Sequence, residues 1–272
     1  MHTRLVAGLL TLLALGACSP AKSTVSAAPA PTEPKGIVDA YRQWVLSESD
    51  ALLKGTEDFT AAIQAGEREK AKAVYAGARA HYERIEPIAE ALGDLDPRID
   101  ARDGDVPAAE WRGYHKLEKI LWSTDDLKTA APLAKTLLDD VKLLRAQIES
   151  ADITVAKLVA GAVDLLNEVS KSKVTGEEER YSHTDLWDFQ ANVDGSAKIW
   201  ELLAPAAKVK DAALSATIDE KLTALDALLA SHKKGDGFQL YSELKPEEIK
   251  ALSVAVDALA EPLSKLGAVF PE

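Results

Sequence analysis

Apolar residues recur every three or four positions from Ile37 almost to the end of the chain. This spacing places them on one face of an α-helix, and Ile37, Tyr41, Trp44 and Val45 form the first such stripe. Ala, Leu, Glu and Lys dominate the composition, which favours helices over sheets. No window alternates apolar and polar residues for long with β-branched side chains. We therefore predict an all-α fold with no significant β-sheet.

The stripes and the loop residues between them divide the chain into seven or eight helices. They form two four-helix bundles side by side, with boundaries at residues 37–150 and 151–272. The first helix has a possible break near Gly55, and Pro87 should kink the second or end it early. Residues 93–107 should form a long loop. The expected helices cover residues 37–63, 67–92, 108–123, 132–150, 155–172, 186–208, 211–233 and 246–266.

The first 17 residues have the features of a lipoprotein signal peptide. Arg4 precedes an apolar run that is too short for a comfortable membrane span, and "LGAC" resembles a bacterial lipobox. This predicts cleavage before Cys18 and lipid attachment to it, and Ser19 favours sorting to the outer membrane. The alternative is an ordinary signal with Cys18 as a spare thiol. Residues 18–36, rich in Pro, Ala, Ser and Thr, should be a flexible tether in the periplasm.

The charge of the chain limits its partners. A formal net charge of −12 makes nucleic acid an unsuitable partner, whereas cations or basic proteins fit better. The sequence has no H-E-x-x-H motif, no G-x-S-x-G motif and no glycine-rich phosphate loop, so nucleophilic and nucleotide chemistry are unsupported. We expect a monomer whose only membrane contact is the lipid anchor.

The stretch "WRGYHKLEKILW", residues 111–122, holds the first candidate site. His115 and Glu118 lie three apart on one helix face, where they form either a metal-binding pair or a polar pair of the bundle. Upstream, Glu83, Glu86 and Glu90 share another face, and carboxylates buried there would need a partner or a cation. His115 is the stronger ligand candidate. Glu118 either binds the metal or orients the site.

The loop that precedes this stretch is rich in aspartate. An EF-hand calcium loop is excluded, because Arg98 occupies the third ligand position and no Gly or Glu follows in register. A different acidic loop packed over the His115 helix remains open. Asp96 is then the first candidate ligand and Asp100 the next.

A second polar cluster lies in residues 176–195. It combines acidic, basic and aromatic side chains, as binding loops on helical scaffolds often do. Capping of the following helix by Thr184 or Asp185 explains part of the pattern. The candidate binding residues are Glu178, Tyr181, His183, Asp185 and Trp187.

Three stretches together carry a resemblance to a known family. They are "YERIEPIAEALGDLDPRIDARDGD", "WRGYHKLEKILW" and "EEERYSHTDLWDFQANVDG". They resemble the EfeO/EfeM family of periplasmic iron-uptake proteins, which carry an imelysin-type, peptidase-like helical domain. The match covers residues 36–272, and the family's G-x-H-x-x-E motif corresponds to Gly113, His115 and Glu118.

The resemblance implies two helical bundles with a cleft and a metal site of His115 with Glu83, Glu86 and Asp96. It also implies delivery of iron to an inner-membrane permease, alongside a haem peroxidase partner. Longer members carry an N-terminal cupredoxin domain, for which the residues before the first helix leave no room. The chain thus resembles the short form of the family, and copper-dependent oxidation of iron is not expected.

A lipid-anchored, non-enzymatic iron-binding protein is the leading interpretation. Carboxylates with one imidazole suit iron, with copper or zinc as competitors in vitro. One alternative is cation-dependent binding of an acidic polysaccharide, with Tyr181, Trp187 and Phe189 stacking sugars beside a basic patch of Lys171, Lys173 and Arg180.

A metallopeptidase is the other alternative. Its zinc site would need a third ligand and a general base beside the H-x-x-E pair. His183 and Glu178 are the candidates for these two roles.

Overall fold

The computed structural model describes residues 34–124 and 126–270. The predicted signal peptide (1–17), Cys18 and Ser19 lie outside the described residues, as does the predicted tether up to residue 33. Across the described ranges, none of the helices has the length and apolarity that crossing a bilayer requires.

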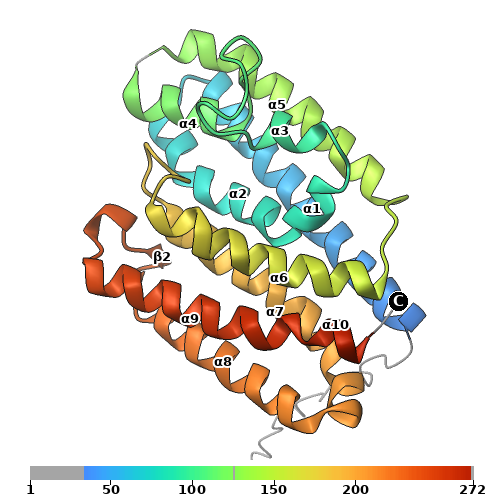
Figure 1. Ribbon diagram of the computed structural model, residues 1–272. Coiled ribbons are helices and arrows are strands. Elements are labelled where there is room, and N and C mark those ends of the chain that lie inside the picture. The colour runs from blue at the N-terminus through green and yellow to red at the C-terminus, as the bar shows by residue number, and fades with distance from the viewer. Residues whose placement is uncertain (1–33, 125, 271–272) are drawn as a thin grey trace, which may run out of the picture.

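The first half of the chain forms a bundle of four main helices with a short fifth helix beside it (Figure 1). The main helices are α1 (Pro34–Gln64), α2 (Arg68–Glu90), α4 (Tyr114–Ser123) and α5 (Leu127–Ile148), and the short one is α3 (Leu95–Ile99). Helix α1 packs against α2 and α5, and α3 and α4 lie against α5.

The second half forms another four-helix bundle, below the first in Figure 1. Its main helices are α6 (Val155–Lys171), α7 (Asp185–Lys210), α8 (Ala212–Ala230) and α9 (Pro246–Ser264). The small elements are η1 (Lys173–Thr175), β1 (Lys233–Lys234), β2 (Gly237–Phe238), η2 (Tyr241–Glu243) and α10 (Leu266–Val269). The all-α prediction is confirmed, because the only sheet among the described residues is the β1–β2 hairpin, two residues to a strand.

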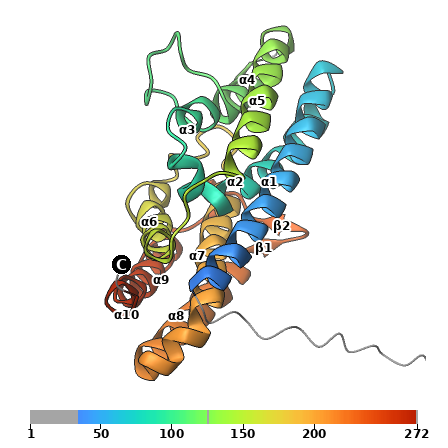
Figure 2. The same ribbon diagram turned by 90° about the vertical axis from the view of Figure 1, so that its right-hand side faces the viewer.

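Helices α2 and α7 join the two bundles along a seam (Figure 2). Buried side chains of both halves form one continuous hydrophobic cluster across it, from Ile37 in α1 to Leu266 in α10. The two halves therefore share a core. A division into two separate domains stays a prediction.

α1 is not broken at Gly55 and α2 does not end at Pro87, and both residues lie at close contacts between helices. α1 continues through Gly55, where an added Cβ would lie 2.8 Å from the Cβ of Ala78 in α2. α2 continues past Pro87 to Glu90, and a Cβ on Gly161 of α6 would lie 2.9 Å from the Cβ of Pro87. Gly55 and Gly161 thus let neighbouring helices approach closely.

Helix α4 begins at Tyr114, six residues later than predicted. Gly113 before it has φ +93°, and a Cβ there would lie 2.2 Å from the carbonyl oxygen of Ile99. Only glycine accepts both the conformation and the contact. The chain therefore turns sharply at Gly113 under α3, and this turn sets the direction of the helix that carries His115.

Gly113→Ala should lower the free energy of unfolding by at least about 2 kcal/mol, because it adds a backbone clash to left-handed strain. Gly104→Ala is the matched control: it also has a positive φ, +105°, but no atom lies within 4 Å of the added Cβ. Urea unfolding followed by circular dichroism measures both variants. Equal losses for the two variants would show that the contact with Ile99 does not matter.

Candidate metal centre

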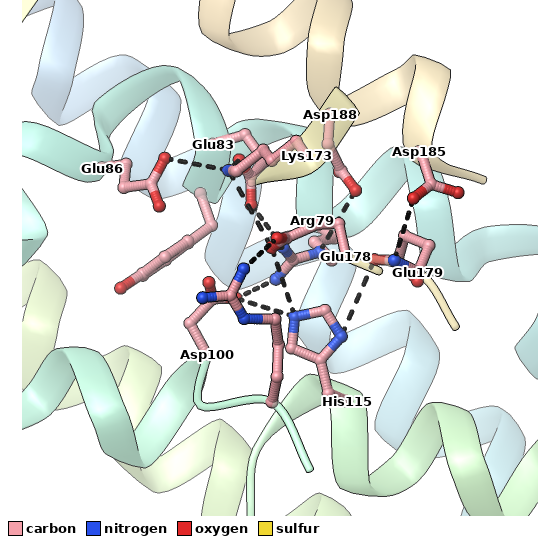
Figure 3. A network of polar contacts seen from close by, with 12 residues as sticks. Arg79, Glu83, Glu86, Asp100, His115, Lys173, Glu178, Glu179, Asp185 and Asp188 are labelled. Carbon is pink, nitrogen blue, oxygen red and sulfur yellow. Dashed lines mark hydrogen bonds and ion pairs between the residues drawn. The ribbon is translucent and has the colours of Figure 1, made fainter. Parts of the chain in front are cut away.

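Acidic side chains gather inside the protein where α2, α4 and the loop before α7 meet (Figure 3). Seven of them are buried: Glu83, Glu86, Glu118, Glu178, Glu179, Asp185 and Asp188. Asp100 lies beside them with 11% of its side chain exposed. The fully buried cations in contact with this group are Arg79 and Lys173, and the partly exposed Arg102 reaches its edge. The negative charges outnumber the positive ones, so protons or a bound cation must compensate them.

Arg79 on α2 is the central cation of the group, with none of its side chain exposed. Its guanidinium lies 2.6 Å from Glu83, 2.7 Å from Glu178 and 2.6 Å from Glu179. It also contacts Asp100, and Asp188 on α7 at 3.6 Å. One arginine therefore connects carboxylates of both bundles.

Lys173 in η1 is the second cation, and its side chain is also fully buried. Its ammonium contacts Glu83 and lies 3.2 Å from Glu86. The Nδ2 group of Asn192 on α7 donates to the same carboxylate oxygens at 3.0 and 3.1 Å. The pair of glutamates is thus bridged by donors of the second bundle.

His115 is held by Glu118, one turn later in α4. The Nδ1 atom of His115 lies 3.4 Å from Oε2 of Glu118. The other oxygen, Oε1, accepts the backbone N–H groups of Tyr181 and Ser182 at 2.8 and 2.7 Å. A proton on Nδ1 that faces this fixed carboxylate leaves the lone pair on Nε2, as in many carboxylate–histidine–metal sites.

The Nε2 atom of His115 is buried without a hydrogen-bond partner among the described residues. It faces Oδ1 of Asp100 at 3.7 Å and Oε1 of Glu178 at 3.6 Å. All three atoms lie within 4.8 Å of one another. Ligand atoms that bind one ion at about 2.1 Å lie roughly 3 Å from one another. A small movement of these three side chains toward one another would therefore let them bind the same ion. One imidazole and two carboxylates suit iron, zinc or manganese.

Three other groups of candidate ligand atoms occur in the described ranges. One joins His115 and Glu118 to Glu179, and another joins Glu83 and Glu86 to Asp100. The last, Glu86 with Glu90 and Glu168, is more exposed. Because these groups share members, they form one connected acidic centre.

A cavity of about 210 Å³ leads toward this centre from the surface. Its outer part carries Glu90, which is exposed, and Glu168. Buried Glu86 and Glu178 also line it, together with Asp100. The cavity therefore offers a cation a path on which carboxylates outnumber the one cationic side chain, Arg102.

Burial and neighbouring charges separate the pKa values of these carboxyl groups. Burial, together with the charge of Glu118, raises the pKa of Glu179 to about 8. Burial also holds the pKa of Glu86 and Asp188 well above the usual range. Burial acts in the same direction on Glu178, but Lys173, His115 and Arg79 outweigh it and hold its pKa well below the usual range. The metal-free centre thus retains protons that an arriving cation would displace.

The structure brings most of the candidate residues of the first half together. His115, Glu118, Glu83, Glu86 and Asp100 all belong to the centre. Asp96, the first loop candidate, belongs to none of the ligand groups and accepts the hydroxyl of Tyr82 at 2.5 Å while lining the cavity.

Three of the five candidates in the second sequence cluster belong to the same centre. Glu178 faces His115, Tyr181 supplies an N–H group to Glu118, and buried Asp185 accepts the N–H of Glu179 at 3.2 Å. His183 belongs to no candidate ligand group of the described chain, and Trp187 packs its ring edgewise against Phe238. The two clusters are therefore one site that spans the seam.

Sequence reasoning missed several residues of the centre: Arg79, Lys173, Glu179, Asp188 and Asn192. Two signals were available. Arg79 and Glu83 are four apart in one helix, and Asp185, Asp188 and Asn192 share one face of α7 at positions i, i+3 and i+7. Polar residues on the inner face of a bundle helix point to a buried network.

The predicted sugar-stacking surface is wrong in two of its parts. Phe189 has no exposed surface and packs near Tyr241, so it offers no face to a ligand. Lys173 is buried between Glu83 and Glu86, so it does not belong to a surface basic patch.

Fold and site together define an all-helical protein with a buried histidine–carboxylate centre between two bundles. The chain belongs to the imelysin family, because residues 37–266 match the model of that family. The resemblance to EfeO/EfeM proteins is also confirmed. An "Efem/EfeO family lipoprotein" of Staphylococcus haemolyticus is 49% identical over 234 residues, which cover 84% of this chain and 82% of the relative.

A longer relative carries a more specific name. The "Iron uptake system component EfeO" of Escherichia coli strain K12 is 45% identical over 239 residues, as is a protein of the same name from Shigella flexneri. These residues cover 86% of this chain but 64% of each relative.

Proposed function

We propose that this protein binds an iron ion at the His115 centre and supplies it to an inner-membrane permease, as a non-catalytic part of an iron-uptake system. The excess of buried carboxylates around an imidazole nitrogen without a partner is the observation that carries the proposal. The name of the Escherichia coli relative, a component of an iron uptake system, supports iron as the cargo.

The ligands closest to the ion would be Nε2 of His115, Oδ1 of Asp100 and Oε1 of Glu178. Arg79 also contacts both carboxylates, and a carboxylate has enough lone pairs to accept from a guanidinium and bind an ion together. Glu118 would orient the imidazole from the other side. Glu83 and Glu86 would add negative charge and further oxygen ligands next to Asp100.

The proposal also covers the location and the partners of the protein. The Staphylococcus relative is named a lipoprotein, which supports Cys18 as the site of a lipid anchor. An anchored protein of this kind would lie in the cell envelope, and in a cell with an outer membrane it would lie in the periplasm. The outer-membrane sorting suggested by Ser19 stays a prediction from the sequence alone. A haem peroxidase is a further proposed partner, by family resemblance.

His115→Ala should weaken Fe²⁺ binding by at least about 100-fold, because it removes the only imidazole of the centre. Anaerobic calorimetry measures the affinity, and parallel Zn²⁺ and Cu²⁺ titrations test selectivity. His81→Ala is the matched control, since His81 contacts Glu48 with 30% of its side chain exposed and lies in no ligand group. Undiminished binding by His115→Ala, or no binding by the wild-type protein, would refute the proposal.

A further inference from the structure

The position of Lys173 suggests a role in metal release. We propose that its ammonium is a built-in competitor of the metal ion: it occupies one end of the centre when no ion is bound, and an arriving ion displaces it. This inference rests on the proposed function and concerns how tightly the same centre holds its ion.

Lys173 occupies a position where an ion would fit. Its ammonium lies between Glu83 and Glu86, which with Asp100 form a group of oxygens within 4.8 Å of one another. An external cation and this ammonium therefore compete for the same oxygens. Two cations so close in a buried site repel each other, and the flexible lysine is the one that can move away.

The structure also provides a place for the displaced ammonium. Glu168 lies 3.8 Å from the Lys173 nitrogen, with 29% of its side chain exposed, and it lines the cavity together with Glu90. The flexible lysine side chain can move from the inner glutamates to this outer pair without leaving acidic surroundings.

The backbone around Lys173 is held in place, which makes the exchange a side-chain movement. The hydroxyl of Tyr241 donates to the carbonyl of Val174 at 2.6 Å. Gly176, with φ +73°, packs so closely on the Tyr241 ring that a Cβ would lie 2.8 Å from it. Glu178, two residues further, therefore keeps its place while the lysine moves.

Arg79 does not share this role. It contacts five carboxylates from both bundles, whereas a lysine is a single point charge on four rotatable bonds. Arg79 fixes the structure of the centre, and Lys173 adjusts its affinity. A competitor of this kind would keep binding weak enough for the ion to be passed on.

Lys173→Met tests the proposal directly, because it keeps an unbranched side chain, one atom shorter, and removes its charge. We expect Fe²⁺ to bind at least about tenfold more tightly, and a ferrous chelator to extract it more slowly. Lys171→Met, which removes an exposed lysine two residues away, should behave as wild type. A folded Lys173→Met protein with unchanged or weaker affinity would overturn the inference.

A second measurement uses the wild-type protein and does not depend on the folding of a variant. Acetylation of lysines followed by mass spectrometry should modify Lys173 more when Fe²⁺ is bound than when it is absent. Equal protection in both states would also overturn the inference. If wild-type protein binds no Fe²⁺, the proposed function fails; if it binds but Lys173 does not respond, only this inference fails.

Discussion

Arg79→Met is expected to lower the free energy of unfolding by about 3–5 kcal/mol, because it leaves buried carboxylates without their main cation. The side chain has no exposed surface and contacts Glu83, Glu178 and Glu179 within 2.7 Å. The carboxyl groups of the variant should take up protons, so its stability loss should be larger at pH 8 than at pH 5. Urea unfolding at both pH values measures this.

Arg145→Met serves as the control for this experiment. Arg145 also lies on a helix and pairs with Asp50 and Glu149, but these partners are 63% and 67% exposed. Such surface pairs contribute at most about 1 kcal/mol. Similar losses for both variants would mean that the buried network does not stabilise the fold.

The metal-free protein is expected to become more stable as the pH falls from 8 to 5. The pKa of Glu179 is about 8 and that of Asp185 about 6, both raised mainly by burial, so the folded state binds more protons than the unfolded state in this range. The pKa of His115 is raised as well, because Glu118 and Glu178 outweigh burial and Arg79. Stability therefore falls as the pH rises through these values, by on the order of 3 kcal/mol.

Below about pH 4.5 the direction should reverse, because the pKa of Glu178 is lowered and its protonation destabilises the folded state. Thermal unfolding from pH 4 to 8, with and without Fe²⁺, measures the profile. Added Fe²⁺ should stabilise most at pH 8, where fewer protons compete for the carboxylates. Glu179→Gln should flatten the metal-free profile between pH 5 and 8. If the metal-free protein became more stable as the pH rises from 5 to 8, the assignment of bound protons to Glu179 and Asp185 would be wrong.

The helices could be predicted from the sequence because each buries one apolar stripe. Helix α6 was predicted to within one residue, since Val155 and Thr154 mark its start clearly. Helix α4 was not, because nothing in residues 108–112 shows that the chain must turn at Gly113 beneath the Ile99 carbonyl. Contacts between segments far apart in the chain decide such boundaries.

The candidate site was only partly predictable for a similar reason. His115 and Glu118 form a recognisable pair within one helix. Lys173 in a polar loop has the pattern of a surface residue, and nothing in the sequence shows that it is buried against Glu83, 90 residues earlier in α2. The pairing of the loop before α7 with α4, through Glu118 and the Ser182 N–H, likewise joins residues 64 apart.

The seam between α2 and α7 has a consequence for how an ion could be released. His115 and Asp100 come from the first half and Glu178 comes from the loop before α7 in the second half, so the ligand group at Nε2 of His115 is complete only across the seam. An ion bound to this group would hold the two halves together. Its affinity would therefore depend on whether the seam is closed, and the ion would in turn stabilise the closed seam. A receiving protein that moved the bundles apart would separate Glu178 from His115 and Asp100, with no need to reach the buried ion.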